Sequence, residues 1–379
     1  VHPLFKWIFC IQKGEKLSIK TNSRSWRFLM LFVVFAMVVV ACGDTSDDAA
    51  EEVVEESTDT TAAPATTAAP AQEESSSAPD GVFKLAIFQD PATQNLFKWY
   101  DTDTDAYSLY QMTGQSVSLF GISYPNYTLI PSMATELVET STDNGDGTFS
   151  YTVPIVEGYE WSDGNPITAQ DWVFTYNTAK GLPLLGQWAA VWPSNCEVEC
   201  VTNVEAIDDY TVKISFNYDP GLTGWQYGAA VAPALSKAYW EQFATSREDL
   251  LAVSGAEAPV ASAFVYDKIE QGAFYTWTYD SDTMYFGGET TNYANGGVAI
   301  SQDNGVAPAV SGEFGDLSGE SFTYANGPFV GQVEFSIYND QDSAYLAFEN
   351  GDVDFVLNPS GVKRATYEKL SRIPGTEVI

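Results

Sequence analysis

The first 80 residues restrict most strongly what this chain can fold into, because they cannot contribute to a globular core. Phe28 to Ala41 form a run of fourteen apolar residues preceded by Arg24 and Arg27, and a basic region before a short apolar run indicates an export signal. The run is shorter than the ~20 residues that a membrane-spanning helix needs. Residues 43–80 hold eleven acidic residues and no Lys or Arg. Such a segment buries too little apolar surface to fold, so a folded body begins near residue 81.

The junction between these two segments reads VVACG at 39–43. Small residues before a Cys at the end of an apolar run resemble the lipobox of bacterial lipoproteins. The resemblance implies that residues 1–42 are a lipoprotein signal peptide and that Cys42 carries the lipid. Residues 43–80, rich in Ser, Thr, Pro and Ala, would then be a disordered acidic tether. A plain signal peptide, or a short membrane anchor with an incidental Cys, is the alternative.

Charge and histidine content exclude several functions for the body. The chain has a net charge of −34, and the part after Cys42 holds 11 basic and 50 acidic residues. A body this acidic repels phosphate backbones, so we expect no nucleic-acid partner. The single histidine, His2, precedes the apolar run, so the body lacks the residue that Ser-His-Asp and Cys-His catalysis and HExxH zinc sites require. We therefore expect no catalytic residue, no metal site and no cofactor.

Two cysteines remain in the body, Cys196 and Cys200, within the loop NCEVEC. In an exported protein the default for such a pair is a small structural disulfide. Two free thiols are the alternative, whereas a metal site would need more Cys or His ligands than this chain has.

Local patterns predict several strands and one well-defined helix. Residues 82–88 (VFKLAIF) and 148–156, where aromatic and aliphatic residues alternate, are typical of strands. The turn DNGDGT at 143–148 lacks the Glu that a calcium loop has at its twelfth position, so it predicts a β-hairpin. Thr168 and Asp171 have the spacing of a capping box, which predicts a helix from there to about Lys180. Residues 104–119 have a mixed helical pattern.

Four segments, in order, resemble the family 5 extracellular solute-binding proteins, the oligopeptide, dipeptide and nickel-binding group of bacterial ABC transporters. The most specific are WSDGNPITAQDWVFTYN at 161–177 and GQVEFSIYNDQDSAYLAFENGDVDFVL at 331–357. YTLIPSMATEL at 127–137 and VEAIDDYTVKISF at 204–216 also match. Residues 262–266 lack the Gly-Pro-Tyr hinge motif of the family, and residues 287–327 match poorly, which suggests a loop insertion.

This resemblance implies an α/β fold of the two-lobed periplasmic-binding-protein kind (type II, cluster C style), with the second lobe incomplete because the chain is C-terminally truncated. Lobe I would comprise residues 81–115 and 204–325, with an extra subdomain at 116–203. Residues 330–379 would start lobe II.

The implied function is that of a substrate-binding lipoprotein of an ABC importer. It would capture a peptide or similar small solute by hinge closure and deliver it to permease and ATPase subunits. The protein would be a monomer, exported and lipid-anchored at the outer face of the cytoplasmic membrane. Two alternatives remain: a carbohydrate-active enzyme or sugar-binding protein with an aromatic-lined cleft, and a surface adhesion or structural lipoprotein.

Candidate ligand-binding residues follow from the position of the first strand and from exposed-looking aromatics. Ligands of open α/β sheets lie beyond the carboxyl ends of the strands, which indicates Phe88, Gln89 and Asp90. The glycine-flanked run GWQYG adds Trp225 and Tyr227. The competing interpretation for each of them is a turn residue or a core aromatic.

Overall fold

The computed structural model describes residues 79–112, 114–123, 127–192, 199–280, 287–301 and 311–377. The signal peptide predicted for residues 1–42, residues 43–78 of the tether predicted for 43–80, and Cys196 lie outside the described residues. Cys200 is disulfide-bonded, and its pairing with Cys196 stays a prediction.

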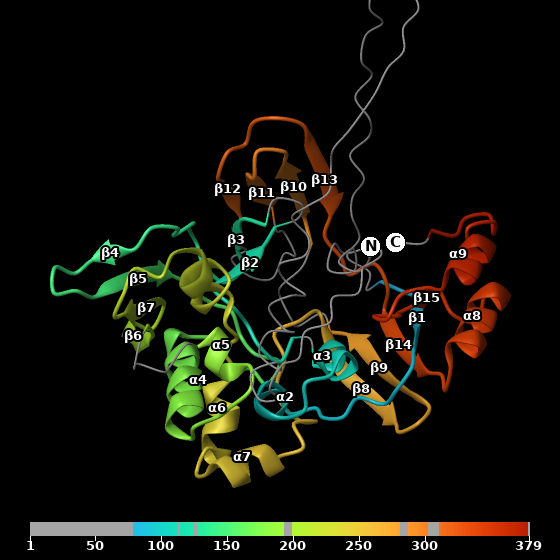
Figure 1. Ribbon diagram of the computed structural model, residues 1–379, viewed down its shortest axis with the longest axis horizontal. Coiled ribbons are helices and arrows are strands. Elements are labelled where there is room, and N and C mark those ends of the chain that lie inside the picture. Colours follow the sequence, from blue (N-terminus) through green and yellow to red (C-terminus); the bar gives the residue numbers. More distant parts are fainter. Residues whose placement is uncertain are drawn as a thin grey trace, which may run out of the picture. The chain divides into compact units, whose positions relative to one another are not determined.

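The sheet that organises the described body has five strands in the order β15-β1-β14-β9-β8 (Figure 1). Strand β1, predicted at 82–88, is confirmed, and it pairs in parallel with both β14 and β15. Strands β9 and β8 continue the sheet in antiparallel pairing. The strands are β1 (Val82–Ile87), β8 (Phe264–Glu270), β9 (Phe274–Tyr279), β14 (Gln332–Ile337) and β15 (Phe355–Val356).

Both faces of the carboxyl half of β1, Leu85–Ile87, are buried, as is typical of a parallel strand covered by helices on both sides. Ala86 packs in a cluster with Ala344 and Ala347 of α8 (Gln341–Asn350). Leu85 and Ile87 point to the opposite face and cluster with Tyr107 of α3 (Ala106–Gln111). Because side chains alternate along a strand, three consecutive residues of β1 thus join two separate cores.

A second sheet is antiparallel, with the order β4-β5-β7-β6. The predicted hairpin at 143–148 is confirmed, since it joins β4 to β5. The predicted helix is confirmed as α4 (Ala169–Gly181), whose first turn carries the Thr168–Asp171 capping box and which packs against β6. The strands are β4 (Thr142–Asp143), β5 (Phe149–Pro154), β6 (Val201–Asp208) and β7 (Thr211–Phe216).

The expectation of a loop insertion at 287–327 is wrong where the segment is described. It forms a third sheet, antiparallel, in the order β12-β11-β10-β13. Thr, Tyr and Phe are frequent in these strands and suit a pleated surface. The expectation of a loop rested on the Gly and Asn content and did not take these strand-forming residues into account. The strands are β10 (Glu289–Tyr293), β11 (Val298–Ser301), β12 (Gly312–Phe314) and β13 (Ser321–Ala325).

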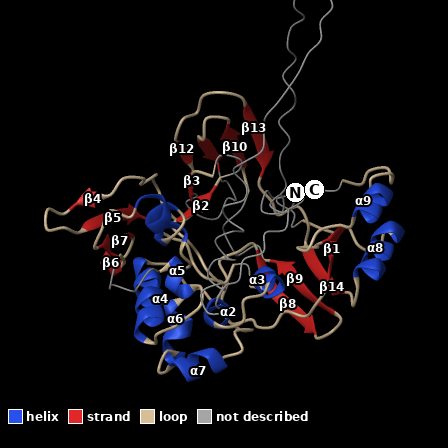
Figure 2. Cartoon of the chain, viewed as in Figure 1, coloured by secondary structure: helices blue, strands red, loops and turns tan. Residues whose placement is uncertain are grey.

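The remaining elements are short (Figure 2). Within the segment predicted as partly helical, 104–119, α3 ends at Gln111, shortly before Gly114 takes a positive φ of 93°. The hairpin β2 (Phe120–Ile122) and β3 (Leu129–Pro131) follows. The other helices are α2 (Leu96–Asp101), α5 (Trp188–Val191), α6 (Lys237–Trp240), α7 (Arg247–Ala252) and α9 (Arg364–Leu370), with a π-helical turn at Leu222–Gln226 and 3-10 turns at Ala229–Val231 and Glu241–Phe243.

Strand pairing cuts across the expected domain boundaries. The register from Val82↔Gln332 to Ile87↔Ile337 places residues 332–337, expected in lobe II, beside β1 of lobe I. The expected boundary at 203/204 falls inside β6, which pairs with β7 in the sheet of the extra subdomain. These boundaries are therefore not breaks between sheets.

We expect Asp171→Ala to lower the free energy of unfolding by about 2–4 kcal/mol, because two partly buried backbone donors would lose their acceptor. Asp171 is buried, and its carboxylate accepts hydrogen bonds from the Thr168 and Lys237 amides at 2.9 and 2.8 Å. Chemical denaturation measures the change. Glu157→Ala, at an exposed site in the same subdomain, serves as control and should change stability little; equal losses in both variants would contradict the role given to Asp171.

Candidate functional site

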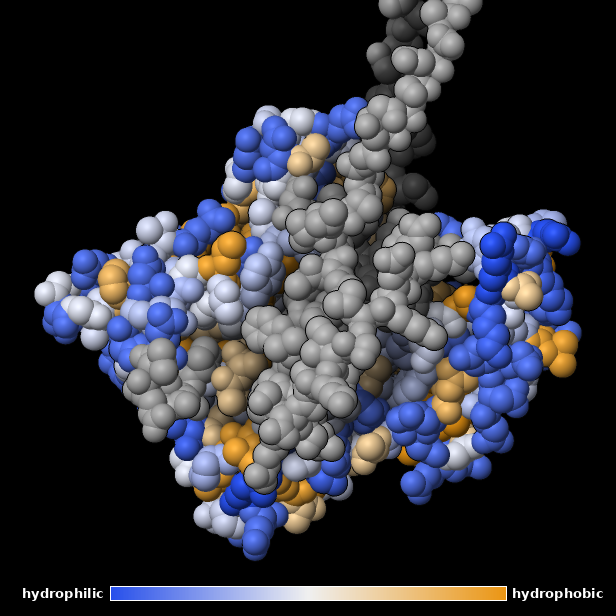
Figure 3. Space-filling model, in the orientation of Figure 1, coloured by the Kyte–Doolittle hydropathy of each residue, from blue (hydrophilic) through white to orange (hydrophobic). Residues whose placement is uncertain are grey.

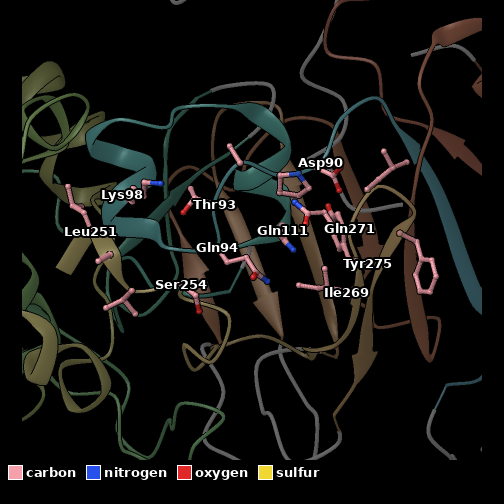
Figure 4. A pocket seen from close by; sticks show the side chains of 16 residues that line it. Asp90, Thr93, Gln94, Lys98, Gln111, Leu251, Ser254, Ile269, Gln271 and Tyr275 are labelled. Atoms are coloured by element: carbon pink, nitrogen blue, oxygen red, sulfur yellow. The ribbon is translucent and has the colours of Figure 1, made fainter. Parts of the chain in front are cut away.

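A cavity of about 390 Å³ opens beside the carboxyl end of β1 (Figure 4). Its wall is formed by the loop 90–94 after β1, helices α2 and α3, residues 251–254 at the end of α7, the β8–β9 hairpin and Ile337 of β14. We call it the edge pocket. Its volume falls within the range of small-molecule sites.

Helix α3 holds the loop after β1 in place. The hydroxyl of Ser108, a fully buried residue, accepts hydrogen bonds from the amides of Ala92 and Thr93 at 2.7 and 3.1 Å. On the other side of the pocket, Asp90 Oδ1 accepts a hydrogen bond from the Gly272 amide in the β8–β9 turn at 2.8 Å. The loop is therefore fixed at both walls.

Asn95 joins the loop to the far wall. Its side-chain oxygen caps α2 by accepting a hydrogen bond from the Lys98 amide, and its Nδ2 donates to the carbonyls of Leu250 and Val253 at 2.8 and 2.9 Å. Gly255 passes so close that an added Cβ would collide with the Gln94 carbonyl. This close approach and the positive φ of 75° make glycine the suitable residue there.

Three side chains of the pocket wall have buried polar atoms with no hydrogen-bond partner among the described residues: Gln94 Nε2, Gln111 Oε1 and Tyr275 Oη. Gln111 and Tyr275 are 2% and 1% exposed. The Tyr275 ring stacks on Phe335 of β14, with ring centroids 4.4 Å apart, which fixes the direction of its hydroxyl. Burial, the largest cause, raises the pKa of Tyr275, and the nearby Tyr266 and Asp105 raise it further, so the hydroxyl stays protonated.

The wall has two charged side chains, Lys98 and Asp90, and within the described part of the chain only Lys98 has an oppositely charged partner. Lys98 Nζ lies 2.7 Å from Asp103 Oδ2, and Asp90 accepts the hydrogen bond from Gly272. The apolar part of the wall comes from Leu251, Val253 and Phe274 among others. The edge pocket thus has a wall of mixed polar and apolar residues.

The structure separates the five predicted ligand-binding residues. Asp90 lines the edge pocket, whereas Phe88 is half-buried and Gln89 is exposed, both outside its wall. Trp225 and Tyr227 also lie outside the wall. Trp225 is 2% exposed, stacks on Tyr151 with centroids 3.7 Å apart, and donates from its indole nitrogen to the Val138 carbonyl; these are the contacts of a core residue.

Tyr227 is exposed, and its hydroxyl donates to the Tyr127 carbonyl at 3.1 Å. A ligand role for the five predicted residues stays a prediction.

Sequence reasoning missed Gln94, Gln111 and Tyr275, which line the edge pocket. The sequence could have indicated Gln94, because it lies in the polar loop that follows the first strand. Gln111 and Tyr275 belong to elements that only the folded chain brings to the edge pocket.

Neither a metal-binding cluster nor a membrane-spanning helix is found within the described residues. No cluster of three or more His, Cys, Asp or Glu side chains there could hold a metal ion. No helix in this part of the chain combines the length and apolarity needed to cross a membrane. On the face shown in Figure 3, hydrophilic residues cover much of the described surface around α8 and α9.

Comparison with known proteins identifies a family. The model of the bacterial extracellular solute-binding proteins, family 5 (middle), matches residues 128–376. No curated protein matches.

Solved structures with the same fold include AppA from Bacillus subtilis in complex with a nonapeptide (16% identity, TM-score 0.50) and DppA from Helicobacter pylori in complex with the peptide STSA (15%, 0.51). The periplasmic EDTA-binding protein EppA is a third (17%, 0.54). Each alignment covers 78% of this chain and 47%, 50% and 46%, respectively, of the solved chain. The chain therefore spans about half the length of these structures, and its α/β fold is that of the two-lobed periplasmic binding proteins.

We expect Tyr275→Phe to leave the free energy of unfolding unchanged or to raise it by up to ~1 kcal/mol, because the lost hydroxyl is buried without a partner. Tyr176→Phe is the matched control. Tyr176 is equally buried, but its hydroxyl donates to the Val201 carbonyl at 2.7 Å, so its loss should destabilise by about 1 kcal/mol. Thermal and chemical unfolding measure both, and a destabilised Tyr275→Phe variant would show that the hydroxyl has a partner.

Proposed function

This chain belongs to family 5 of the bacterial extracellular solute-binding proteins, and on that premise we propose that it is the substrate-binding part of an ABC importer. It captures a peptide or a similar small solute and delivers it to permease and ATPase subunits. The family match over residues 128–376 carries the proposal. Two of the similar structures hold a peptide, which supports a peptide-sized solute.

The edge pocket supports a binding role because it lies where solutes bind in open α/β sheets, beyond the carboxyl end of β1. We place residues 332–356 in the same lobe as β1, since β14 and β15 flank that strand in one sheet. The solute would contact this edge first, and a second lobe would then close over it. Hinge closure needs only that the solute prefers the closed state.

Binding without turnover tests this proposal in the intact protein. We expect titration calorimetry with a panel of short peptides to show saturable binding at one site, and small-angle scattering to show a smaller radius of gyration with solute. Mass spectrometry of the incubated peptides should find them unchanged. Release of products from the peptides or from a polysaccharide panel would contradict a pure binding role, as would a radius of gyration that no solute changes.

We also propose that Cys42 is lipid-modified and holds the protein at the outer face of the cytoplasmic membrane, with residues 43–80 as a tether. Cys42→Ser removes the thiol that would be acylated, so the protein should lose incorporation of labelled fatty acid and move from the membrane to the soluble fraction. Cys10→Ser lies before the apolar run and is the control that should leave both unchanged. A Cys42→Ser variant that stays labelled would contradict the anchor.

A further inference from the structure

One edge strand of the third sheet lacks the features that usually block a sheet edge. Strand β13 pairs with β10 on one side, and no described strand pairs with its other side (Figure 1). Its sequence, SFTYA, contains no charged residue and no Pro, and its register with β10 runs without a bulge. Charges, bulges, Pro and very short strands are the usual means of keeping other chains from pairing with an edge.

The other edge strands of the three larger described sheets have such protection. Strands β6 and β8 contain register shifts and charged residues. Strands β4 and β15 have two residues each, and β12 has three, among them Glu313. Of the edge strands described in these sheets, β13 is therefore the one that a further strand could extend.

The backbone of β13 offers hydrogen-bonding groups on this open side. Glu320 and Asn326, which flank the strand, form backbone hydrogen bonds toward the β10 side, each at 2.8 Å. Successive residues of a paired strand direct their amides and carbonyls to alternate edges. The backbone groups of Ser321, Thr323 and Ala325 consequently face the open side, and all three residues are exposed.

Aromatic side chains lie beside the open edge. Phe322 is 66% exposed, and its ring stacks on that of Tyr324 with centroids 5.8 Å apart. The two residues are two positions apart, so they share one face of the sheet. Alternate side chains of an added strand would meet these rings, which can hold apolar groups and the ammonium or guanidinium group of a cationic residue.

Charge decides which partner fits this edge. Residues 287–327 contain five acidic residues and no Lys or Arg. Glu289, Glu313, Asp316 and Glu320 are exposed on or beside the described part of the sheet. A second copy of the chain would bring these like charges together, whereas a basic segment would be attracted to them.

We propose that the open edge of β13 binds a positively charged, extended segment of a partner protein as an added strand. Backbone hydrogen bonds to Ser321, Thr323 and Ala325 provide the pairing, and the neighbouring acids and aromatic rings select for Lys or Arg in the partner. This site is separate from solute binding, because no residue of β13 lines the edge pocket.

The test uses a labelled peptide with capped ends, Ac-Lys-Val-Lys-Val-Lys-Val-Lys-NH2, titrated against the intact protein by fluorescence anisotropy. We expect saturable binding that weakens as salt rises. The peptide in which Glu replaces every Lys should not bind. The Lys peptide N-methylated at every backbone nitrogen keeps its charge but cannot donate to β13, so its affinity should be at least about tenfold lower.

Thr323→Pro removes an amide on the open side and leaves the amides that bond to β10. It should weaken binding of the Lys peptide at least about tenfold. Thr323→Val is the matched control: it also loses the hydroxyl that lies 2.8 Å from Thr291 Oγ1, but it keeps the amide and should bind like the unchanged protein. Thermal unfolding checks that both variants are folded, and the N-methylated peptide tests strand pairing on the unchanged protein.

Several results would overturn the proposal. One is a Lys peptide that does not bind, or that binds no better than its Glu or N-methylated counterpart. Another is equal binding to the folded Thr323→Pro variant, which would place the peptide elsewhere, for instance at the solute site. Sedimentation velocity gives a third: a dimer that Thr323→Pro separates would show that the edge pairs with a second copy of the chain.

Discussion

The parallel pairing of β1 with β14 and β15 is the interaction on which the rest of the described structure depends. It joins residue 82 to residue 332 and residue 85 to residue 355, so nearly the whole described chain is enclosed between the paired strands. Burial on both faces follows from this pairing, because α8 covers Ala86 while α3 covers Leu85 and Ile87. A strand buried in this way has no polar face, which explains the continuous apolar end of its sequence.

The same pairing creates the edge pocket. Strands β1 and β14 end side by side, and the antiparallel β9 begins beside them, so a loop, a hairpin and two helices converge beyond one edge of the sheet. A hydrogen bond that Ser108 accepts from the Ala92 amide and one that Asn95 donates to the Leu250 carbonyl then fix the loop against α3 and α7. The pocket is thus prepared before any solute arrives, and a prepared site loses less conformational entropy on binding.

Most buried polar groups in proteins have partners, and Asp171 and Tyr176 follow that rule. Gln94, Gln111 and Tyr275 of the pocket wall have buried polar atoms that depart from it, and so do nine other side chains among the described residues, which lie outside that wall. Unpartnered buried atoms therefore do not by themselves mark the edge pocket.

The sequence by itself determined the features that depend on neighbours along the chain. The hairpin at 143–148, the capping box of Thr168 and Asp171 and the first strand all follow from patterns within a few residues, and the four ordered motifs identified the family. Tertiary structure alone decided that residues 332–356 share a sheet with β1, that Trp225 is stacked in the core, and that Tyr275 reaches the pocket. The physical reason is that strand register and the burial of a side chain are set by partners far away in the sequence, and local patterns carry no information about which partner a strand or ring will meet.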